Sequence, residues 1–245
     1  MATTPAPTSV VSVTPSVGLV TWDSEGQEGG PFHSRKLHVP STSSGLTIGR
    51  GYDMKERKAA GIIQDLTASD VGLTDATTLS AAAGLSGEAA KDFITEHGLE
   101  DFEISKLGQK LLFLRTYEEI KADVKRICGK ADVAKKYGAT DWNKLHPAIV
   151  DILVDLRFRG DYTSNARALI QKTVAKNDLV AFAKVLKQAS HWTGVPSDRF
   201  NRRVAYLNKA LAAHKAAAPA AKPLEAQPAH KALPTDPPKL SLPRH

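Results

Sequence analysis

Cysteine, methionine and aromatic residues are scarce in this chain of 245 residues. It contains one cysteine and two methionines, and aromatic residues make up 6% of it. A single cysteine, Cys128, excludes an intramolecular disulfide, so folding does not depend on an oxidising environment. Cys128 follows Val124 and Ile127 in a helical pattern, which favours a buried structural thiol over a nucleophile.

Long hydrophobic runs are also missing. No stretch approaches the roughly 20 apolar residues of a membrane-spanning helix, and the N-terminus lacks the basic-then-apolar order of a secretory signal. We therefore expect synthesis in the cytoplasm without a cleavable signal, and no membrane span. The eight histidines show no metal-ligand spacing, since no cysteine and no Glu-x-x-His pattern accompanies them. We expect neither a metal nor a cofactor.

Charge, in contrast, is plentiful and unbalanced. The formal net charge is +7, from 33 Lys and Arg against 26 Asp and Glu. Such basicity suits a polyanionic partner, whether cell wall or nucleic acid, and it equally suits plain solubility. The aromatic residues are not interleaved with the basic ones as a stacking platform for nucleic acid requires. Nucleic acid is therefore not the expected partner.

Composition divides the chain into three segments. Residues 1–18 contain Pro, Thr, Ser and Val without a charged side chain, which is typical of a flexible leader. Residues 215–245 are rich in Ala, Pro and Lys and too poor in apolar side chains to order themselves, so we expect a disordered tail. The domain between them, 19–214, divides into a small β lobe over about 19–54 and a helical lobe over about 55–214.

Apolar spacing predicts a series of helices in the second part of that domain. The helix expected at 147–158 is apolar at nearly every interior position, which places it at the centre of the helical lobe. The expected helices cover residues 54–66, 76–83, 86–96, 105–127, 147–158, 166–175, 179–188 and 196–213.

The most informative stretch is GLTIGRGYD, residues 45–53. Residues 46–48 alternate apolar and polar as in a half-buried strand, so Thr47 faces away from the core. If the strand stays extended, Asp53 shares the face of Thr47, and the glycines allow another backbone or a large ligand to approach closely. The segment thus offers a hydroxyl and a carboxylate, while Glu25 supplies a second carboxyl upstream. Two carboxyls across a groove are what glycoside hydrolysis needs.

The run SGLTIGRGYDM, preceded by SEG and by HVP, resembles the pesticin-type branch of the phage lysozyme-like family. The resemblance covers about residues 19–214 and includes further stretches: His146–Ile149, Asp155–Tyr162, Trp192 and Asp198–Arg203. It implies a mainly α fold of the α+β lysozyme-like kind. A small glycine-rich β-sheet lobe and a larger helical lobe are expected, with the catalytic groove between them.

The resemblance also implies a muramidase, a glycoside hydrolase that cleaves the β-1,4 bond between N-acetylmuramic acid and N-acetylglucosamine, with inversion. Its partner is then bacterial peptidoglycan, met in the periplasm or on the cell wall by a monomeric phage endolysin or antibacterial effector. Delivery falls to a holin, to lysis or to a secretion machine. Two alternatives stay open: a non-catalytic peptidoglycan-binding module of lysozyme fold and a lytic transglycosylase. A basic nucleic-acid-binding helical protein is disfavoured, because the aromatic residues are not interleaved with the basic ones.

Glu25 is the expected general acid. A carboxyl that protonates a glycosidic oxygen near neutral pH must keep its proton, so its pKa must be raised by a desolvated site. Glu28 is the rival, because both glutamates precede a glycine. The resemblance favours Glu25, which lies 22 residues before Thr47, whereas Glu28 lies 19 residues before it.

Asp53 and Thr47 are the candidates for activating water: the carboxylate takes a proton and the hydroxyl holds the water. The aspartate follows the threonine, as in the pesticin pattern; in the better-known phage enzymes it precedes it. Taken singly, Thr47 also fits an ordinary strand position and Asp53 a turn or helix N-cap. An inverting site predicts that the carboxyls of Glu25 and Asp53 are about 6.5–9.5 Å apart.

Five further residues are expected to bind substrate or support the site: Arg50, Tyr52, Arg157, Arg159 and Asp161. Arg50 is a candidate to fix Glu25 or to bind carboxylates of the wall. Arg157 and Arg159 have two equally good interpretations: one of them pairs with a catalytic carboxylate, or they form a salt bridge between the lobes. The charged run 198–203 has helical spacing, and we expect an exposed helix face with an internal ion pair.

Overall fold

The computed structural model describes residues 12–30 and 33–217. It is mainly helical, with 59% helix and a small two-stranded sheet, which confirms the mainly α prediction. The α-helices are α1 Leu19–Trp22, α2 Ala59–Thr67, α3 Leu73–Ser80, α4 Glu88–Glu96, α5 Lys106–Cys128, α6 Ala131–Tyr137, α7 Pro147–Arg159, α8 Ser164–Ala175, α9 Leu179–Leu186 and α10 Ser197–Ala217. The strands are β1 Thr47–Ile48 and β2 Tyr52–Asp53, and the 3-10 turns are Trp142–Lys144 and Ala189–His191.

Local capping explains where several of these helices begin. The Ser105 hydroxyl accepts a hydrogen bond from the N–H of Gly108 and caps α5, and the Asp178 carboxylate accepts one from Ala181 and caps α9. Helix α4 follows Gly87 and has no side-chain cap. The short helices α1 and α6 were not expected.

The two ends of the chain are only partly described. The leader expected at 1–18 lies outside the described residues up to residue 11, and the tail expected at 215–245 does so from residue 218 onward. The described end of the leader packs on α5: Lys110 Nζ donates to the carbonyl of Ser12 at 2.6 Å. Gly18 lies so close to the Tyr117 ring that an added Cβ would be 2.6 Å from it.

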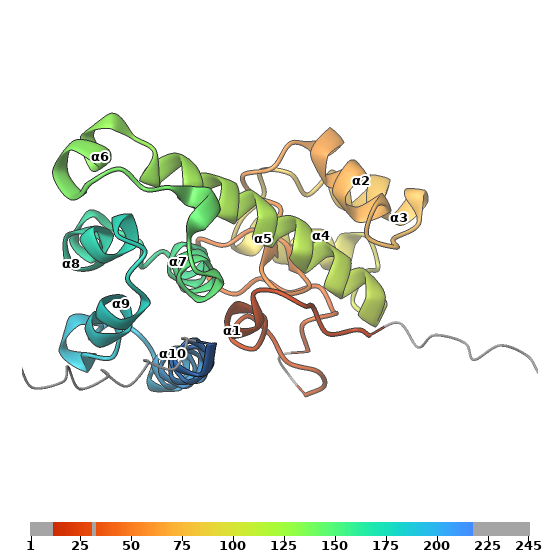
Figure 1. The fold of residues 1–245 in the computed structure, drawn as a ribbon. Coiled ribbons are helices and arrows are strands. Elements are labelled where there is room, and N and C mark those ends of the chain that lie inside the picture. Colours follow the sequence, from red (N-terminus) through yellow and green to blue (C-terminus); the bar gives the residue numbers. More distant parts are fainter. Residues whose placement is uncertain (1–11, 31–32, 218–245) are drawn as a thin grey trace, which may run out of the picture.

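Apolar side chains form two main cores that are joined by α5, which runs between them (Figure 1). The first and smaller core combines the hairpin residues Leu46, Ile48 and Tyr52 with α2, α3, α4 and the start of α5. The second and larger core combines the end of α5 with α7, α8, α9 and α10. The cores therefore divide within α5, whereas the sequence suggested a boundary near residue 54.

Helix α7 lies at the centre of the second core, as its apolar pattern predicts. Ile149, Ile152, Leu153 and Leu156 are fully buried there. Asp155 is equally buried among them, which requires compensation for its charge.

Strands β1 and β2 form an antiparallel hairpin in which Thr47 pairs with Asp53 and Ile48 with Tyr52. The chain therefore does not stay extended from 47 to 53. Thr47 and Asp53 share a face because they are cross-strand partners. The N–H of His38 donates to the Thr47 carbonyl and the N–H of Thr47 to the His38 carbonyl, at 3.0 and 2.9 Å, which adds a third short segment to the hairpin.

Candidate functional site

Glu25 follows the short helix α1 and lies where that segment meets the hairpin, α7 and α10. Its Oε1 accepts an ion-paired hydrogen bond of 2.5 Å from Arg199 Nη1. Its Oε2 lies 3.6 Å from the position that a Cβ on Gly51 would occupy. Desolvation by burial raises the pKa of the Glu25 carboxyl, although the charge and hydrogen bond of Arg199 oppose the change.

Glu28 lies in a different environment. Its carboxylate accepts hydrogen bonds from Arg35 Nε at 2.9 Å and from Gln109 Nε2 at 2.6 Å. Slight burial raises its pKa, but these hydrogen bonds outweigh that effect and hold the pKa below its usual value. Of the two glutamates that precede a glycine, only Glu25 has the direction of shift that an acid needs.

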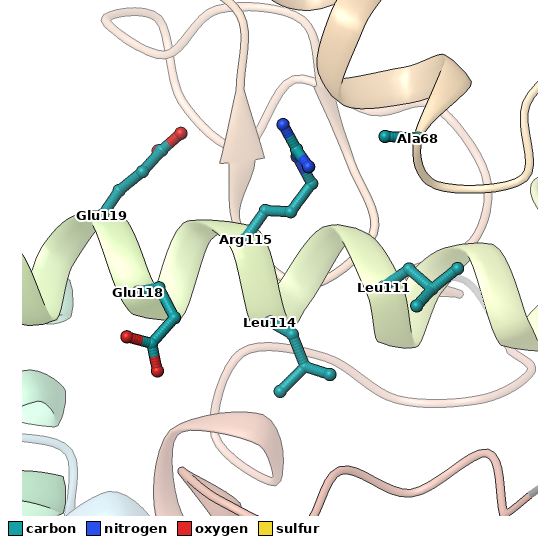
Figure 2. Close-up of a pocket in the computed structure, with 6 residues that line it drawn as sticks. All are labelled: Ala68, Leu111, Leu114, Arg115, Glu118 and Glu119. Atoms are coloured by element: carbon teal, nitrogen blue, oxygen red, sulfur yellow. The ribbon is translucent and has the colours of Figure 1, made fainter.

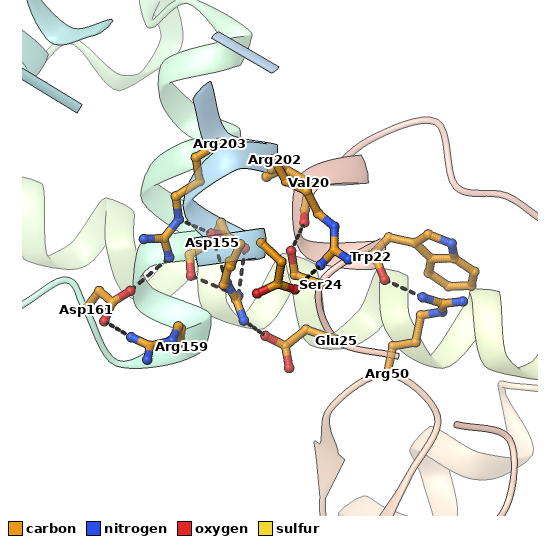
Figure 3. Close-up of polar contacts among 12 residues, drawn as sticks. Val20, Trp22, Ser24, Glu25, Arg50, Asp155, Arg159, Asp161, Arg202 and Arg203 are labelled. Atoms are coloured by element: carbon orange, nitrogen blue, oxygen red, sulfur yellow. Dashed lines mark hydrogen bonds and ion pairs between the residues drawn. The ribbon is translucent and has the colours of Figure 1, made fainter. Parts of the chain in front are cut away.

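A row of alternating charges leads away from Glu25 between α7 and α10 (Figure 3). Arg199 donates to Asp155 at 2.7 Å as well as to Glu25. Arg203 donates to Asp155 at 2.6 Å and to Asp161 at 2.9 Å. We call the set Glu25, Arg199, Asp155, Arg203, Asp161 and Arg159 the charge row; it contains three carboxyl groups and three guanidinium groups.

The charge row corrects the expectation that residues 198–203 form an exposed helix face. Arg203 is 1% exposed and Arg199 is 7% exposed, and both meet the fully buried Asp155. Only Asp198 and Arg202 form the expected exposed ion pair, at 3.2 Å. The sequence did carry a signal: arginines four residues apart share a helix face, and an acid interrupts the apolar pattern of α7.

The three expected supporting residues that follow the centre of α7 have different partners. Arg159 pairs with Asp161 at 2.5 Å and donates to the Gly194 carbonyl at 2.7 Å, so both belong to the charge row. Arg157 instead pairs with Asp123 of α5 at 2.6 Å. It is not brought to Glu25.

Tyr52 and Arg50 both lie in the hairpin, and their side chains have different partners. Tyr52 alternates with Asp53 and points into the first core, where its hydroxyl donates to Asp65 at 2.8 Å. Arg50 is buried and donates to the carbonyls of Trp22 and Gly26. Arg50 therefore binds the backbone on both sides of Glu25. It does not bind the Glu25 carboxylate, and its side chain does not extend into solvent.

Thr47 and Asp53 share a hairpin face but are already engaged. The Thr47 hydroxyl donates to the Gly45 carbonyl at 3.1 Å, and the residue is 4% exposed. The Asp53 carboxylate accepts the N–H of Gly45 at 3.0 Å and that of Lys55 at 2.8 Å, one on each oxygen. The separation expected between the carboxyls of Glu25 and Asp53 stays a prediction.

Two hollows described on the surface lie elsewhere. The larger, of about 470 Å³, lies along α5 beside Ala68, with Leu111, Arg115 and Glu119 among its lining residues (Figure 2). The smaller lies over the segment 191–195 and includes Asp161 of the charge row. Neither is lined by Glu25, Thr47 or Asp53.

Residues 12–30 and 33–217 contain no group of three or more His, Cys, Asp or Glu that is placed to hold a metal ion. Within the same ranges, no helix has both the length and the apolar character needed to cross a bilayer.

Comparison with known proteins gives a family without an assigned activity. No curated protein matches the chain. Residues 18–204 match the family described as "Domain of unknown function (DUF8812)", and this range runs from the start of α1 into α10. It includes the whole charge row, the hairpin and Arg50. Because the match covers well over half of its length, the chain belongs to the DUF8812 family.

Proposed function

We propose that this protein is a lysozyme-like muramidase that hydrolyses the β-1,4 bond between N-acetylmuramic acid and N-acetylglucosamine, with Glu25 as general acid. The observation that carries the proposal is the environment of Glu25. Burial raises the pKa of this carboxyl, and its Oε2 lies over the glycine turn of the hairpin that bears Thr47 and Asp53. A raised pKa keeps the proton available near neutral pH.

The proposed reaction uses both sides of the hairpin turn. Glu25 donates its proton to the glycosidic oxygen as the bond to the anomeric carbon breaks. A water molecule attacks that carbon from the opposite side, and Asp53 accepts the proton that the water loses. Because the Thr47 hydroxyl donates to Gly45, its lone pairs are left to accept a hydrogen bond from this water.

One observation favours a lytic transglycosylase as the second candidate. Both oxygens of Asp53 already accept backbone N–H groups, which fits a carboxylate that holds the loop at Gly45. A transglycosylase needs only Glu25, because the sugar's own hydroxyl attacks and an anhydro product forms.

Mass spectrometry of muropeptides released from purified sacculi separates the candidates. Reducing-end muramic acid supports hydrolysis, and anhydro products support the transglycosylase. No release by folded protein would contradict both activities and favour a peptidoglycan-binding module. The biological settings that we propose are a phage endolysin or an antibacterial effector acting on peptidoglycan.

The assignment of the acid is tested by a matched pair of variants. We expect Glu25→Gln to lower the rate of wall hydrolysis by at least about 100-fold, because the proton donor is lost. Glu28→Gln removes the next carboxylate along the chain, which is held ionised by its partners, and should retain most activity. Circular dichroism should show both variants folded, and turbidity clearing measures their activity. Full activity of folded Glu25→Gln would contradict the assignment of Glu25.

A further inference from the structure

We infer that Arg50 is a positioning residue: it ties the backbone on both sides of Glu25 to the turn of the hairpin. The inference rests on the proposed function and names a residue through which the site is held. Arg50 Nη1 donates to the carbonyls of Trp22 and Gly26, the second at 2.6 Å. These two carbonyls bracket the segment that carries Glu25.

The surroundings of Arg50 are built for this contact. Its guanidinium carbon lies 4.0 Å from the centre of the Trp22 ring, a cation–π geometry, and the residue is 6% exposed. Figure 3 shows the guanidinium beside Trp22, with Glu25 between Arg50 and the rest of the charge row. A buried guanidinium is costly unless its donors find acceptors, and of the Arg50 nitrogens Nη1 has both carbonyls while the buried Nε has no partner. The two carbonyls are therefore the polar contacts that compensate for the burial of Arg50.

Glycine is required at three positions around this contact, either by the backbone conformation or by lack of space. Gly49 and Gly51 have φ angles of +65° and +85°, which favour glycine and form the turn that directs Arg50 inward. A Cβ on Gly26 would lie 2.6 Å from Ser34 Cβ and 3.1 Å from Arg50 Cγ. Glycine at position 26 therefore lets the backbone approach Arg50.

Arg50 acts on Glu25 through the backbone. The charged groups that influence the Glu25 carboxyl are Arg199, Asp155 and Arg159. If the contact is lost, the segment around Glu25 is released from the hairpin and its carboxyl gains access to water. The geometry and the protonation of Glu25 should then change together.

The test compares Arg50→Met and Arg50→Lys with a matched control, Arg57→Met. Arg57 stacks on Tyr52 of the same hairpin at 4.0 Å and pairs with Glu119 and Asp65, away from Glu25. The readouts are the pKa of Glu25, from carboxyl carbon NMR of the full chain, and kcat and KM on sacculi.

We expect Arg50→Met to lower the pKa of Glu25 toward its ordinary value and to reduce kcat at least tenfold, with KM within threefold. Arg50→Lys should restore part of both, since an ammonium still donates to carbonyls. Arg57→Met should lower the melting temperature without moving the Glu25 titration. Arg57 Nε donates to the Asp53 carbonyl at 3.2 Å, so this control is compared by the titration of Glu25 and not by kcat. An unchanged titration in folded Arg50→Met, or an equal change of the titration in Arg57→Met, would overturn the inference.

Two further outcomes are distinguishable. If Arg50→Met does not fold, Arg50→Lys carries the test alone, and a titration of Glu25 identical to that of the wild type would then overturn the inference. If the wild-type protein releases no muropeptides, the proposed function fails, while the titration still tests Arg50.

Discussion

The carboxyls of Asp155 and Glu25 share Arg199 but differ in what else surrounds them. Asp155 is fully buried and is bound by two arginines, whereas Glu25 has one arginine and stands at the end of the charge row. The charge of the buried Asp155 is thus compensated by two guanidinium groups. For Glu25, burial outweighs the pairing with Arg199 and raises the pKa of its carboxyl, which is what the proposed proton donor requires.

The raised pKa of Glu25 predicts a dependence of stability on pH. The folded protein holds this proton more tightly than the unfolded chain, whose glutamate has a pKa near 4.5. The stabilisation is therefore complete below that value and is lost as pH rises through the folded pKa. We expect the melting temperature of the wild type, relative to Glu25→Gln, to fall as the pH increases from acidic to neutral. A relative rise over this range would contradict the direction of the shift.

Loss of Asp155 should be far more damaging than loss of an exposed equivalent. Asp155→Asn leaves the guanidinium groups of Arg199 and Arg203 without their central partner, and breaking such a buried pair costs about 3–5 kcal/mol. Asp123 also binds two arginines, but its side chain is 25% exposed, so Asp123→Asn should cost about 1 kcal/mol or less. Urea denaturation measures the free energy of unfolding of both variants. Equal losses would contradict the expectation that burial makes the ion pairs of Asp155 more costly to break than those of Asp123.

At the scale of elements, the hairpin turn leaves little space for a side chain. A Cβ on Gly51 would lie 2.5 Å from the Phe158 ring, at a φ of +85°. Gly84 has a nearly identical φ of +84°, but nothing lies within 4 Å of its would-be Cβ. The two glycines therefore share a left-handed backbone conformation and differ in the packing around it.

This pair gives a prediction that isolates packing from strain. Gly84→Ala should lose about 1–2 kcal/mol of unfolding free energy, from the left-handed backbone alone. Gly51→Ala should lose at least about 1 kcal/mol more, because Phe158 must move. It should also lose activity, since Glu25 lies beside the same turn. Thermal unfolding measures the stability and turbidity clearing the activity. Equal destabilisation of Gly51→Ala and Gly84→Ala would show that the Phe158 ring moves aside at no measurable cost.

Several elements could be predicted from sequence because they follow from local pattern. The apolar run of α7 and the N-caps Ser105 and Asp178 act within one helix, so their sequence signals suffice. The burial of Arg199 and Arg203 could not be derived this way, because it depends on α7 meeting α10. Likewise, the inward turn of Arg50 depends on acceptors in a segment more than 20 residues away.

At the scale of the whole molecule, one long helix connects two cores of different size. Helix α7 contributes the most fully buried side chains to the larger core, and α5 spans both. Backbone amides in such a central helix open only when much of the structure unfolds. The smaller core, built on short helices and a two-stranded hairpin, has less to hold it closed.

Hydrogen exchange tests this difference. We expect the amides of α7 to exchange most slowly, at rates that follow global unfolding, while those of α2, α3 and α4 exchange faster through local opening. Mass spectrometry of peptides after timed exchange measures both groups. Slowest exchange in α2–α4 would show that the smaller core is the more stable one.

The two oxygens of Glu25 are chemically distinct because of where its neighbours lie. Oε1 is bound to Arg199, which can only donate, so the proton of the neutral acid belongs on Oε2. Oε2 faces Gly51, where the hairpin presents a hydrogen in place of a side chain. The acidic proton of Glu25 therefore points toward the hairpin turn. In the proposed reaction, the sugar oxygen that takes this proton therefore approaches Oε2 beside the hairpin turn, in space that a side chain at position 51 would occupy.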